Sequence, residues 1–536
     1  MKKGILNKIV LSSFLLLSTI SLSLLTSCND TNSEGKTTIT FFGWGNETEV
    51  ALTEQFVNEY NESQDEIYVK YTSIPSEDYA TKIGNALRSK NPPDVLIAGD
   101  GEIKPWIELG GLASLDEYLD NSQVFDLSDF WEEGQNRYLY NVETRMNGSG
   151  HYYGVMRDLS PTVLFYNKTA FEKVGITCIS LSEEECLKQY GCAAGYFEYE
   201  GKKYFNNKIA MNWEEMLELS KINTFNTNSE YRNPSASTTY GIYYVNWFSL
   251  GWSVGANSLQ FVEDSSEKLG GHYEFSLNDT RPNYSVKEGQ TVTIGSKTYN
   301  EGELIDYGHL DLLTMEDKSK CNELPSALEA MQFYVDLSTK YNVAPKPNFM
   351  NSTSSYSVFA SGNQTAMIVD SRYAVGIYRS LIKEPGKGNG FEWDCAPLPV
   401  HENGIKAGHS GSLAYCISAK SKNKDAAFKF IEYINGEEGQ IAFAQAGFTI
   451  PNTKTLSNSE YFLQSDKAPY NSEVFIEAAA YQTVGDWGFL PSKDWITPWA
   501  NRLNGDVLNG NTPLKNALDA SAAETQKVID NYYSKI

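Results

Sequence analysis

The sequence predicts an α/β protein of two lobes, each an open sheet flanked by helices. Three observations support this fold class. A strand–helix–strand–helix–strand order follows residue 37, and a similar strand pattern restarts near residue 163. Of the 536 residues, 41% are apolar and only 21% are charged, so the chain can bury more than one core.

The first lobe is predicted from the order of its apolar patterns. Residues 38–42 are β-branched and aromatic, and residues 67–71 alternate as a second strand does. Residues 49–60 and 79–87 repeat apolar side chains at helical spacing. Residues 94–98 form a short apolar run typical of a buried parallel strand. Ligands of such sheets bind beyond the carboxyl ends of the strands, here the loops 43–47 and 99–101.

The second lobe is predicted from three further strands at residues 163–166, 241–245 and 366–369. Polar or aromatic residues follow each strand: Asn167, Asn246, Trp247, Asp370, Ser371, Arg372 and Tyr373. Residues 177–210 and 270–321 interrupt this pattern and are interpreted as surface insertions. In the second insertion, Gly295 and Ser296 separate two strand-like runs and predict a hairpin.

The N-terminus indicates export and anchoring. Lys2, Lys3 and Lys8 precede an apolar run over residues 9–25, which is too short and Ser-rich for a membrane span. The run ends in Leu-Thr-Ser-Cys at residues 25–28, which resembles the lipobox of bacterial lipoproteins. That resemblance implies a signal peptide over residues 1–27, lipidation of Cys28 and a flexible tether over 28–36. Ordinary cleavage near Ser27 is the alternative.

Charge and cysteine content exclude several kinds of site. A net charge of −24 disfavours nucleic acid and anionic membrane surfaces as partners. The five histidines are scattered, and no cysteine spacing fits a zinc or redox motif, so we expect no metal and no cofactor. Six cysteines remain beyond Cys28, and a loop disulfide among the first three is the favoured arrangement: Cys178, Cys186, Cys192, Cys321, Cys395 and Cys416.

Several blocks of sequence resemble one family, the extracellular solute-binding proteins that serve sugar importers of the ATP-binding-cassette (ABC) type. The central block is Val-Met-Arg-Asp at 155–158, Val-Leu-Phe-Tyr-Asn-Lys at 163–168 and Phe-Glu-Lys-Val-Gly at 171–175. Blocks at 359–367, 424–439 and 447–451 follow in the same order. Two positions depart from the family: Met156 replaces a frequent Pro, and Tyr373 stands where maltose-binding relatives place a Trp.

The resemblance implies a type II-like periplasmic-binding-protein fold with the ligand cleft between the lobes. It places lobe one at 37–153 plus 401–449 and lobe two at 154–400 plus 450–536. Closure about a hinge is documented for such proteins. The implied function is capture of a carbohydrate, expected to be an oligosaccharide, by a monomer that delivers it to permease subunits in the membrane. The implied protein is not an enzyme.

A sugar site needs flat rings for its C–H faces and directional polar groups for its hydroxyls. Position after predicted strands and similarity to the family together select the candidates. The stacking candidates are Trp44, Trp247, Trp252, Tyr373 and Trp499. The candidates for hydroxyl contacts are Asn46, Glu47, Asp100, Asp158, Asn246, Asp370 and Arg372.

Each candidate also has a structural interpretation. The aromatic residues can belong to the core, and Arg372 can pair with Asp370 or Asp158. Asp158 can cap a helix, and Glu47 can occupy a first helical turn.

Other functions also stay open. The ligand can instead be a polyamine or a peptide, and the protein can act as a ligand sensor. A secreted glycoside hydrolase, which also needs paired carboxylates, is a further alternative.

Overall fold

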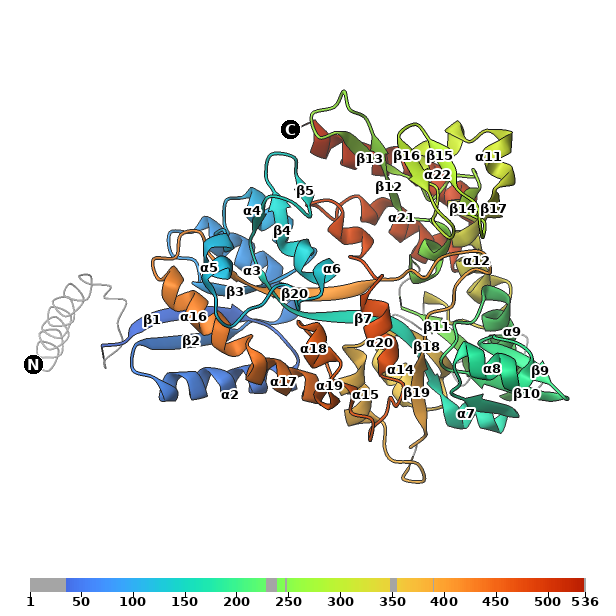
Figure 1. Ribbon diagram of the computed structural model, residues 1–536, viewed down its shortest axis with the longest axis horizontal. Coiled ribbons are helices and arrows are strands. Elements are labelled where there is room, and N and C mark those ends of the chain that lie inside the picture. Colours follow the sequence, from blue (N-terminus) through green and yellow to red (C-terminus); the bar gives the residue numbers. More distant parts are fainter. Residues whose placement is uncertain (1–34, 228–238, 246–247, 348–353, 389, 535–536) are drawn as a thin grey trace, which may run out of the picture.

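A central sheet connects two lobes in the computed structural model, which describes residues 35–227, 239–245, 248–347, 354–388 and 390–534 (Figure 1). The strand order is β11 (Tyr240–Tyr244), β18 (Thr365–Ser371), β7 (Val155–Asn167), β20 (Ser410–Ile417), β3 (Val95–Gly99), β1 (Thr37–Gly43) and β2 (Ile67–Ser73), while β19 (Trp393–Ala396) and β21 (Ile450–Pro451) pair with β7 outside this path. The predicted α/β fold class is confirmed. Within the described ranges, no helix is both long and apolar enough to cross a membrane.

Strand β7 carries the chain from one lobe into the other, and all of its residues are buried. Its first half pairs with β20, and its second half pairs with β18 and β19. Successive side chains point to opposite faces, so Phe165 packs in one core cluster while Leu164 and Tyr166 pack in another. Burial on both faces explains the unbroken apolar run Val-Leu-Phe-Tyr at residues 163–166.

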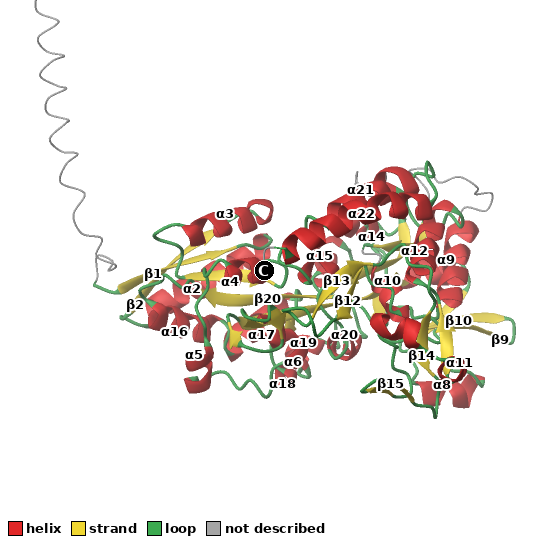
Figure 2. Ribbon diagram, turned by 90° about the horizontal axis from the view of Figure 1, so that it is seen from above, coloured by secondary structure: helices red, strands yellow, loops and turns green. Residues whose placement is uncertain are grey.

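Lobe one contains the parallel strands β1, β2 and β3, in the strand–helix–strand–helix–strand order that the apolar patterns predict. Helices cover both faces of this half of the sheet, with α3 on one side and α5 and α16 on the other (Figure 2). The helices of this lobe are α2 (Glu47–Ser63), α3 (Ser76–Arg88), α4 (Ile103–Glu108), α5 (Asp116–Asn121), α6 (Glu132–Gln135), α16 (Lys424–Ile434) and α17 (Glu437–Ala446).

The start of helix α2 and a small three-stranded sheet position residues of lobe one that face lobe two. Asn46 caps the start of helix α2: its side chain accepts hydrogen bonds from the backbone of Thr48 and Glu49, and its own backbone N–H donates to the Glu49 carboxylate. A small sheet of β4 (Leu139–Asn141), β5 (Met146–Asn147) and β6 (His151–Tyr152) holds the loop between β4 and β5. That loop lies next to the carboxyl end of β3 in the site described below.

Lobe two surrounds β11 and β18 and ends in a helical segment. Its helices include α7 (Lys168–Lys173), α9 (Trp213–Thr227), α10 (Phe248–Gly251), α12 (Ala327–Thr339), α14 (Ser355–Ala360), α15 (Ala374–Leu381), α18 (Lys454–Ser457), α19 (Glu460–Leu463) and α20 (Glu473–Ala479). The C-terminal helices α21 (Ile496–Arg502) and α22 (Leu514–Tyr533) pack on each other beside β13, in red and green at the upper right of Figure 1. The lobe boundaries given above stay predictions, since β7 belongs to both halves of the sheet.

The first insertion forms β8 (Ile176–Ile179), α8 (Glu183–Tyr190), β9 (Tyr196–Tyr199) and β10 (Lys202–Asn206). Its three cysteines are free thiols, as are the other three cysteines of the described chain. The disulfide expected among Cys178, Cys186 and Cys192 is therefore not formed in this structure, although Cys186 and Cys192 pack in one small apolar cluster.

The second insertion has a core of its own. It contains β13 (Gly271–Phe275), β14 (Asn283–Val286), β15 (Val292–Ile294), β16 (Lys297–Tyr299), η3 (Tyr307–Leu312), α11 (Met315–Ser319) and β17 (Cys321–Leu324). The hairpin predicted at Gly295 is confirmed, with β15 antiparallel to β16. Strand β13 also pairs with β12 (Leu259–Glu263), which precedes the insertion. This β12–β13 pair brings the insertion to the space between the lobes.

Candidate functional site

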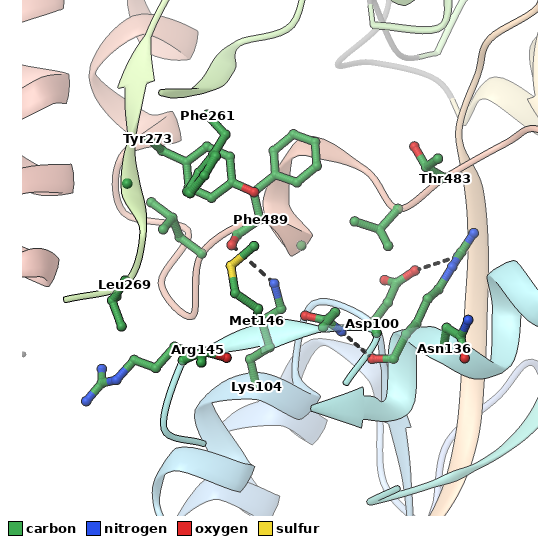
Figure 3. A pocket seen from close by; sticks show the side chains of 18 of the residues that line it. Asp100, Lys104, Asn136, Arg145, Met146, Phe261, Leu269, Tyr273, Thr483 and Phe489 are labelled. Carbon is green, nitrogen blue, oxygen red and sulfur yellow. Dashed lines mark hydrogen bonds and ion pairs between the residues drawn. The ribbon is translucent and has the colours of Figure 1, made fainter. Parts of the chain in front are cut away.

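A cavity of about 380 Å³ lies between residues of the two predicted lobes (Figure 3). Lobe one contributes the loop after β3, helix α4, residues 133–137 and the β4–β5 loop. Lobe two contributes the β12–β13 pair, residues 483–490 and the end of α22. The volume falls within the range of small-molecule sites.

One wall of the cavity is polar and centred on Asp100 and Arg137. Asp100 directly follows β3, and Arg137 Nη1 donates to Asp100 Oδ2 at 3.1 Å. The guanidinium also donates to the backbone oxygen and the hydroxyl of Ser410, at 2.6 and 2.5 Å. Burial raises the pKa of Asp100, and the charge of Arg137 opposes that rise. The pair is thus a fixed, largely desolvated dipole in this wall of the cavity.

Two further polar groups of this wall come from α4 and β5. Lys104 Nζ donates to the backbone oxygen of Phe489 in the opposite lobe at 3.2 Å, and burial lowers the pKa of Lys104 to about 8. The side chain of Asn147 donates to the Arg137 backbone at 2.6 Å, and its buried Oδ1 has no hydrogen-bond partner among the described residues. Asn147 therefore holds an unpaired acceptor within this wall, next to the cavity.

The opposite wall is aromatic. The rings of Tyr273 and Phe489 stack with centroids 5.7 Å apart and planes 15° from parallel, and Phe261 packs edge-on against Tyr273 at 5.2 Å. All three rings are half-buried and point into the cavity, facing Lys104 and Asp100 (Figure 3). Partly exposed flat rings across from charged groups suit a ligand with both apolar faces and hydroxyls.

The loop that carries Phe489 begins with the turn η4 (Asp486–Gly488). Asp486 is buried and accepts a hydrogen bond from the Ser258 hydroxyl. Burial raises the pKa of Asp486 to about 7. On the same turn, the half-buried ring of Trp487 packs edge-on against His409 at 4.8 Å.

Of the predicted contact residues, Asp100 lines this cavity. Asn46 and Tyr373 instead meet each other from opposite lobes. Asn46 Nδ2 donates to the Tyr373 hydroxyl at 2.8 Å, and that hydroxyl donates to Glu49 Oε2 at 2.9 Å. Trp44 is half-buried beside Tyr79, with 6.4 Å between ring centroids. The hydrogen bonds among Asn46, Glu49 and Tyr373 form a contact between the lobes, which we call the interlobe latch.

Glu47 and Asp158 occupy structural positions. Glu47 is exposed in the first turn of α2, as the structural interpretation expects. Asp158 lies within β7, so it does not cap a helix, and its carboxylate accepts from Arg157 Nε at 2.5 Å and from the Leu413 backbone at 3.2 Å. Neither residue lines the cavity.

Four other candidates are buried away from the cavity. Asp370 accepts a hydrogen bond from the Tyr378 hydroxyl, and burial raises its pKa to about 7. The Arg372 guanidinium is fully buried over Phe462, and no ion pair joins it to Asp370 or Asp158 within the described part of the chain. Trp252 and Trp499 pack in the apolar cluster of the C-terminal helices. Their roles in binding stay predictions that this arrangement does not favour.

The remaining predicted residues, Asn246, Trp247 and Cys28, lie outside the described residues. In the described ranges, no three His, Cys, Asp or Glu side chains are grouped so that they could hold a metal ion.

Sequence reasoning missed most of the cavity wall: Lys104, Asn136, Arg137, Asn147, Phe261, Tyr273 and Phe489. One usable signal was the aromatic, glycine-bounded run Gly-Asp-Trp-Gly-Phe at residues 485–489, which is typical of a loop that presents rings. Another was the alternation in the β12 and β13 segments. It places Phe261 opposite Tyr273 once the two strands pair.

Comparison with known proteins identifies the family. A sequence model of the bacterial extracellular solute-binding proteins matches residues 44–441. The chain belongs to this family. The match covers most of the sequence and includes the central block and the blocks at 359–367 and 424–439 that predicted it. The family consists of solute-binding proteins, not enzymes.

Solved structures with similar folds include an ABC substrate-binding protein from Listeria monocytogenes in complex with cycloalternan, with TM-score 0.62 and 18% identity over 92% of this chain and 99% of that one. Maltose-bound MalE3 of T. maritima has TM-score 0.61 and 16% identity, with coverages of 92% and 99%. The GacH receptor of Streptomyces glaucescens, solved unliganded and with acarbose, gives TM-score 0.61 and 16% identity, also with 92% and 99% coverage. These likenesses show the two-lobe fold.

Proposed function

We propose that this protein is a lipid-anchored solute-binding protein that captures an oligosaccharide between its lobes and delivers it to the permease of an ABC transporter. The observation that carries the proposal is the interlobe cavity, in which three half-buried rings face a polar wall around Asp100 and Arg137. Sugars present apolar C–H faces and hydroxyls to such walls. The ligands in the similar structures, cycloalternan, maltose and acarbose, support the same class.

The charges of the cavity favour a neutral ligand over a polyamine. Lys104, Arg137 and Arg145 line it together with only two carboxylates, Asp100 and Glu133. Arg137 already pairs with Asp100 and Arg145 with Glu108, so a polycation would find no unpaired excess of carboxylates here and would gain little beyond cation–π contacts with the rings. A neutral saccharide is not repelled by any of these charges, and its hydroxyls can bond to the charged groups that line the cavity.

Capture also requires that the ligand favours the closed arrangement of the lobes. Lys104 and the backbone of Phe489 already meet across the cavity, and Lys493 pairs with Glu102 at 2.9 Å across the same boundary. A ligand that touches both walls makes its full set of contacts only when the lobes are closed, so binding shifts the equilibrium toward closure. The permease can then recognise the closed form. Anchoring through Cys28 belongs to the same proposal.

The test is a thermal-shift and calorimetry panel on the chain from Asn29 onward. Malto-, isomalto-, cello- and manno-oligosaccharides, polyamines and short peptides are the ligands. A ligand at about 100 times its Kd adds about 2.7 kcal/mol of stability, or a few degrees in Tm. We expect one saccharide class to raise Tm and to be recovered uncleaved.

Matched variants locate the site. Phe489→Ala removes a ring of the cavity and should abolish the shift, while Tyr461→Ala removes a ring that is 47% exposed and distant from the cavity and should retain it. The proposal is overturned if only polyamines or peptides bind, if nothing in the panel binds, or if the saccharide is returned cleaved.

A further inference from the structure

A second cavity, of about 490 Å³, adjoins the one described above. It lies between the β12–β13 pair and residues 304–309 of the second insertion, with Gln260, Lys297 and His309 among its polar lining. Phe261, Tyr273 and Phe489 line both cavities. The aromatic wall is therefore a boundary that the two cavities share.

The three rings are packed as a platform and not as a closed core. They remain half-buried, although Leu259 and Phe275 on the same two strands are buried in the apolar cluster beneath them. Burying the rings would add about 1.5–3 kcal/mol each, so rings kept partly exposed between two cavities are available to a ligand.

The insertion holds its side of the second cavity in a fixed position. Arg281 donates to Asp279 at 2.7 Å, and its guanidinium lies 4.5 Å from the centre of the Tyr307 ring. His309 shares a 2.5 Å hydrogen bond with the Tyr299 hydroxyl, and Lys297 pairs with Asp306 at 2.5 Å. These contacts already hold the side chains of this wall before any ligand arrives, which reduces the entropic cost of binding to it.

The polar groups of the second cavity also suit hydroxyls. Gln260 uses its amide nitrogen to donate to the Gly255 backbone at 2.8 Å, and an amide, an imidazole, an ammonium and a carboxylate lie around the same space. These groups can both donate to and accept from hydroxyls. The two cavities therefore have the same chemical character on either side of the rings.

We propose that the second cavity is an additional saccharide subsite built by the insertion, so that the protein prefers a linear oligosaccharide long enough to cross the three rings. This inference rests on the proposed function. It assigns the insertion a role in selecting ligand length. Short saccharides fill the first cavity alone, while longer ones extend over Tyr273 and Phe489 toward Gln260 and His309.

Gly308 allows a direct test. It lines the second cavity and not the first, and a Cβ built there meets no atom within 4 Å. Its backbone does not require glycine, because its φ lies outside the left-handed region. Gly308→Phe should place a bulky side chain at the edge of the subsite without strain. Gly308→Ala is the small control, and Gly505→Phe adds the same bulk at another open glycine that lines neither cavity.

The experiment is calorimetry with maltose through maltoheptaose, or with the matching linear series of whichever saccharide class the panel selects. We expect affinity to rise with length by about tenfold or more, which corresponds to about 1.4 kcal/mol. Gly308→Phe should remove that gain while leaving the affinity for the shortest ligand unchanged. Gly308→Ala and Gly505→Phe should keep the gain. Gln260→Ala is a second, non-bulky variant and should weaken only the longer ligands.

The outcomes separate the two proposals. Binding without a dependence on length, or a length dependence that survives both Gly308→Phe and Gln260→Ala, overturns the second subsite and leaves the proposed function standing. Absence of binding by every saccharide overturns the proposed function, and the subsite with it.

Discussion

The two walls of the interlobe cavity are built in different ways. The polar wall stands at the end of β3, where Asp100 and Arg137 are buried and bonded to each other, and Arg137 also donates to Ser410. The aromatic wall comes from the β12–β13 pair, whose second strand belongs to the insertion, and from a C-terminal loop, and its rings are half-buried. The polar wall is therefore built from buried residues next to the central sheet, while the aromatic wall is built from half-buried residues on segments outside that sheet. Stability should depend on the first and ligand choice on the second.

The largest effect on stability is expected from Arg137→Met. The change leaves the buried Asp100 carboxylate without its partner, and breaking a buried pair costs about 3–5 kcal/mol. Urea unfolding of the ligand-free protein measures the loss. Arg145→Ala is the matched control, since its pair with Glu108 is partly exposed and contributes about 1 kcal/mol or less.

A double variant tests the reason for that loss. Adding Asp100→Asn to Arg137→Met removes the charge that was left unpaired, so part of the stability should return. If the double variant loses as much free energy of unfolding as the two single variants together, Asp100 and Arg137 are not a coupled pair. The contrast between the two walls would then be weaker.

The next effect concerns pH and the base of the aromatic wall. Burial raises the pKa of Asp486 from 3.8 to about 7 in the folded protein. The folded state therefore holds a proton that the unfolded chain releases between about pH 4 and 7, and stability falls as pH rises through that window. A difference of this size corresponds to about 4 kcal/mol. Asp486→Asn should stabilise the protein above pH 7 and flatten this dependence.

Tm measured at intervals from pH 4 to pH 8 checks the prediction. Asp370, whose pKa is also raised to about 7, leaves part of the slope in place, so the comparison is between variants at each pH. Asp494→Asn, at an exposed position, is the control and should leave the curve unchanged. A parallel curve for Asp486→Asn and the unmodified chain would contradict the assignment.

A smaller change should affect binding alone. Tyr273→Ala removes one stacking ring and should weaken the saccharide by about 1.5–3 kcal/mol, or about ten- to a hundredfold in Kd. Tyr273→Phe keeps the ring that stacks on Phe489 and should bind normally, because the proposed contact is with the ring and not with the hydroxyl. If Tyr273→Phe is as weak as Tyr273→Ala, the hydroxyl and not the ring contacts the ligand.

The sequence predicted the parts of the molecule that follow from local periodicity. The strands β1, β2, β3 and β18 and helix α2 lie where the patterns place them, and Asp100 was found because it follows a buried strand. The rule that ligands bind beyond strand ends then led to one wall of the cavity.

The other residues depend on contacts that no local pattern records. Arg137 lies in a short 3-10 turn and reaches Asp100 and Gln482 over long sequence distances. Tyr273 faces the cleft only because β13 pairs with β12. Phe489 faces it only because the chain returns from lobe one to lobe two after residue 449. In contrast, Trp252 and Trp499 have the flat aromatic side chain that a stacking residue needs, but they lie in the core. Residue type and loop position did not separate these two cases.

The smallest predicted effect tests whether the lobes close as units. Tyr373→Phe removes the hydroxyl that joins Asn46 and Glu49 across the interlobe latch, at a cost of about 1 kcal/mol. Because those bonds exist only when the lobes meet, their loss should favour the open form and weaken every ligand to the same small extent.

Tyr118→Phe is the matched control for the latch, since its hydroxyl donates to Asp425 at 2.7 Å within lobe one. Small-angle scattering of the ligand-free protein should show expansion for Tyr373→Phe and none for Tyr118→Phe. Expansion with unchanged affinity would mean that the ligand, and not the latch, supplies the free energy of closure. Weakening that differs between short and long saccharides would mean that Tyr373 contacts the ligand directly, as the sequence first indicated.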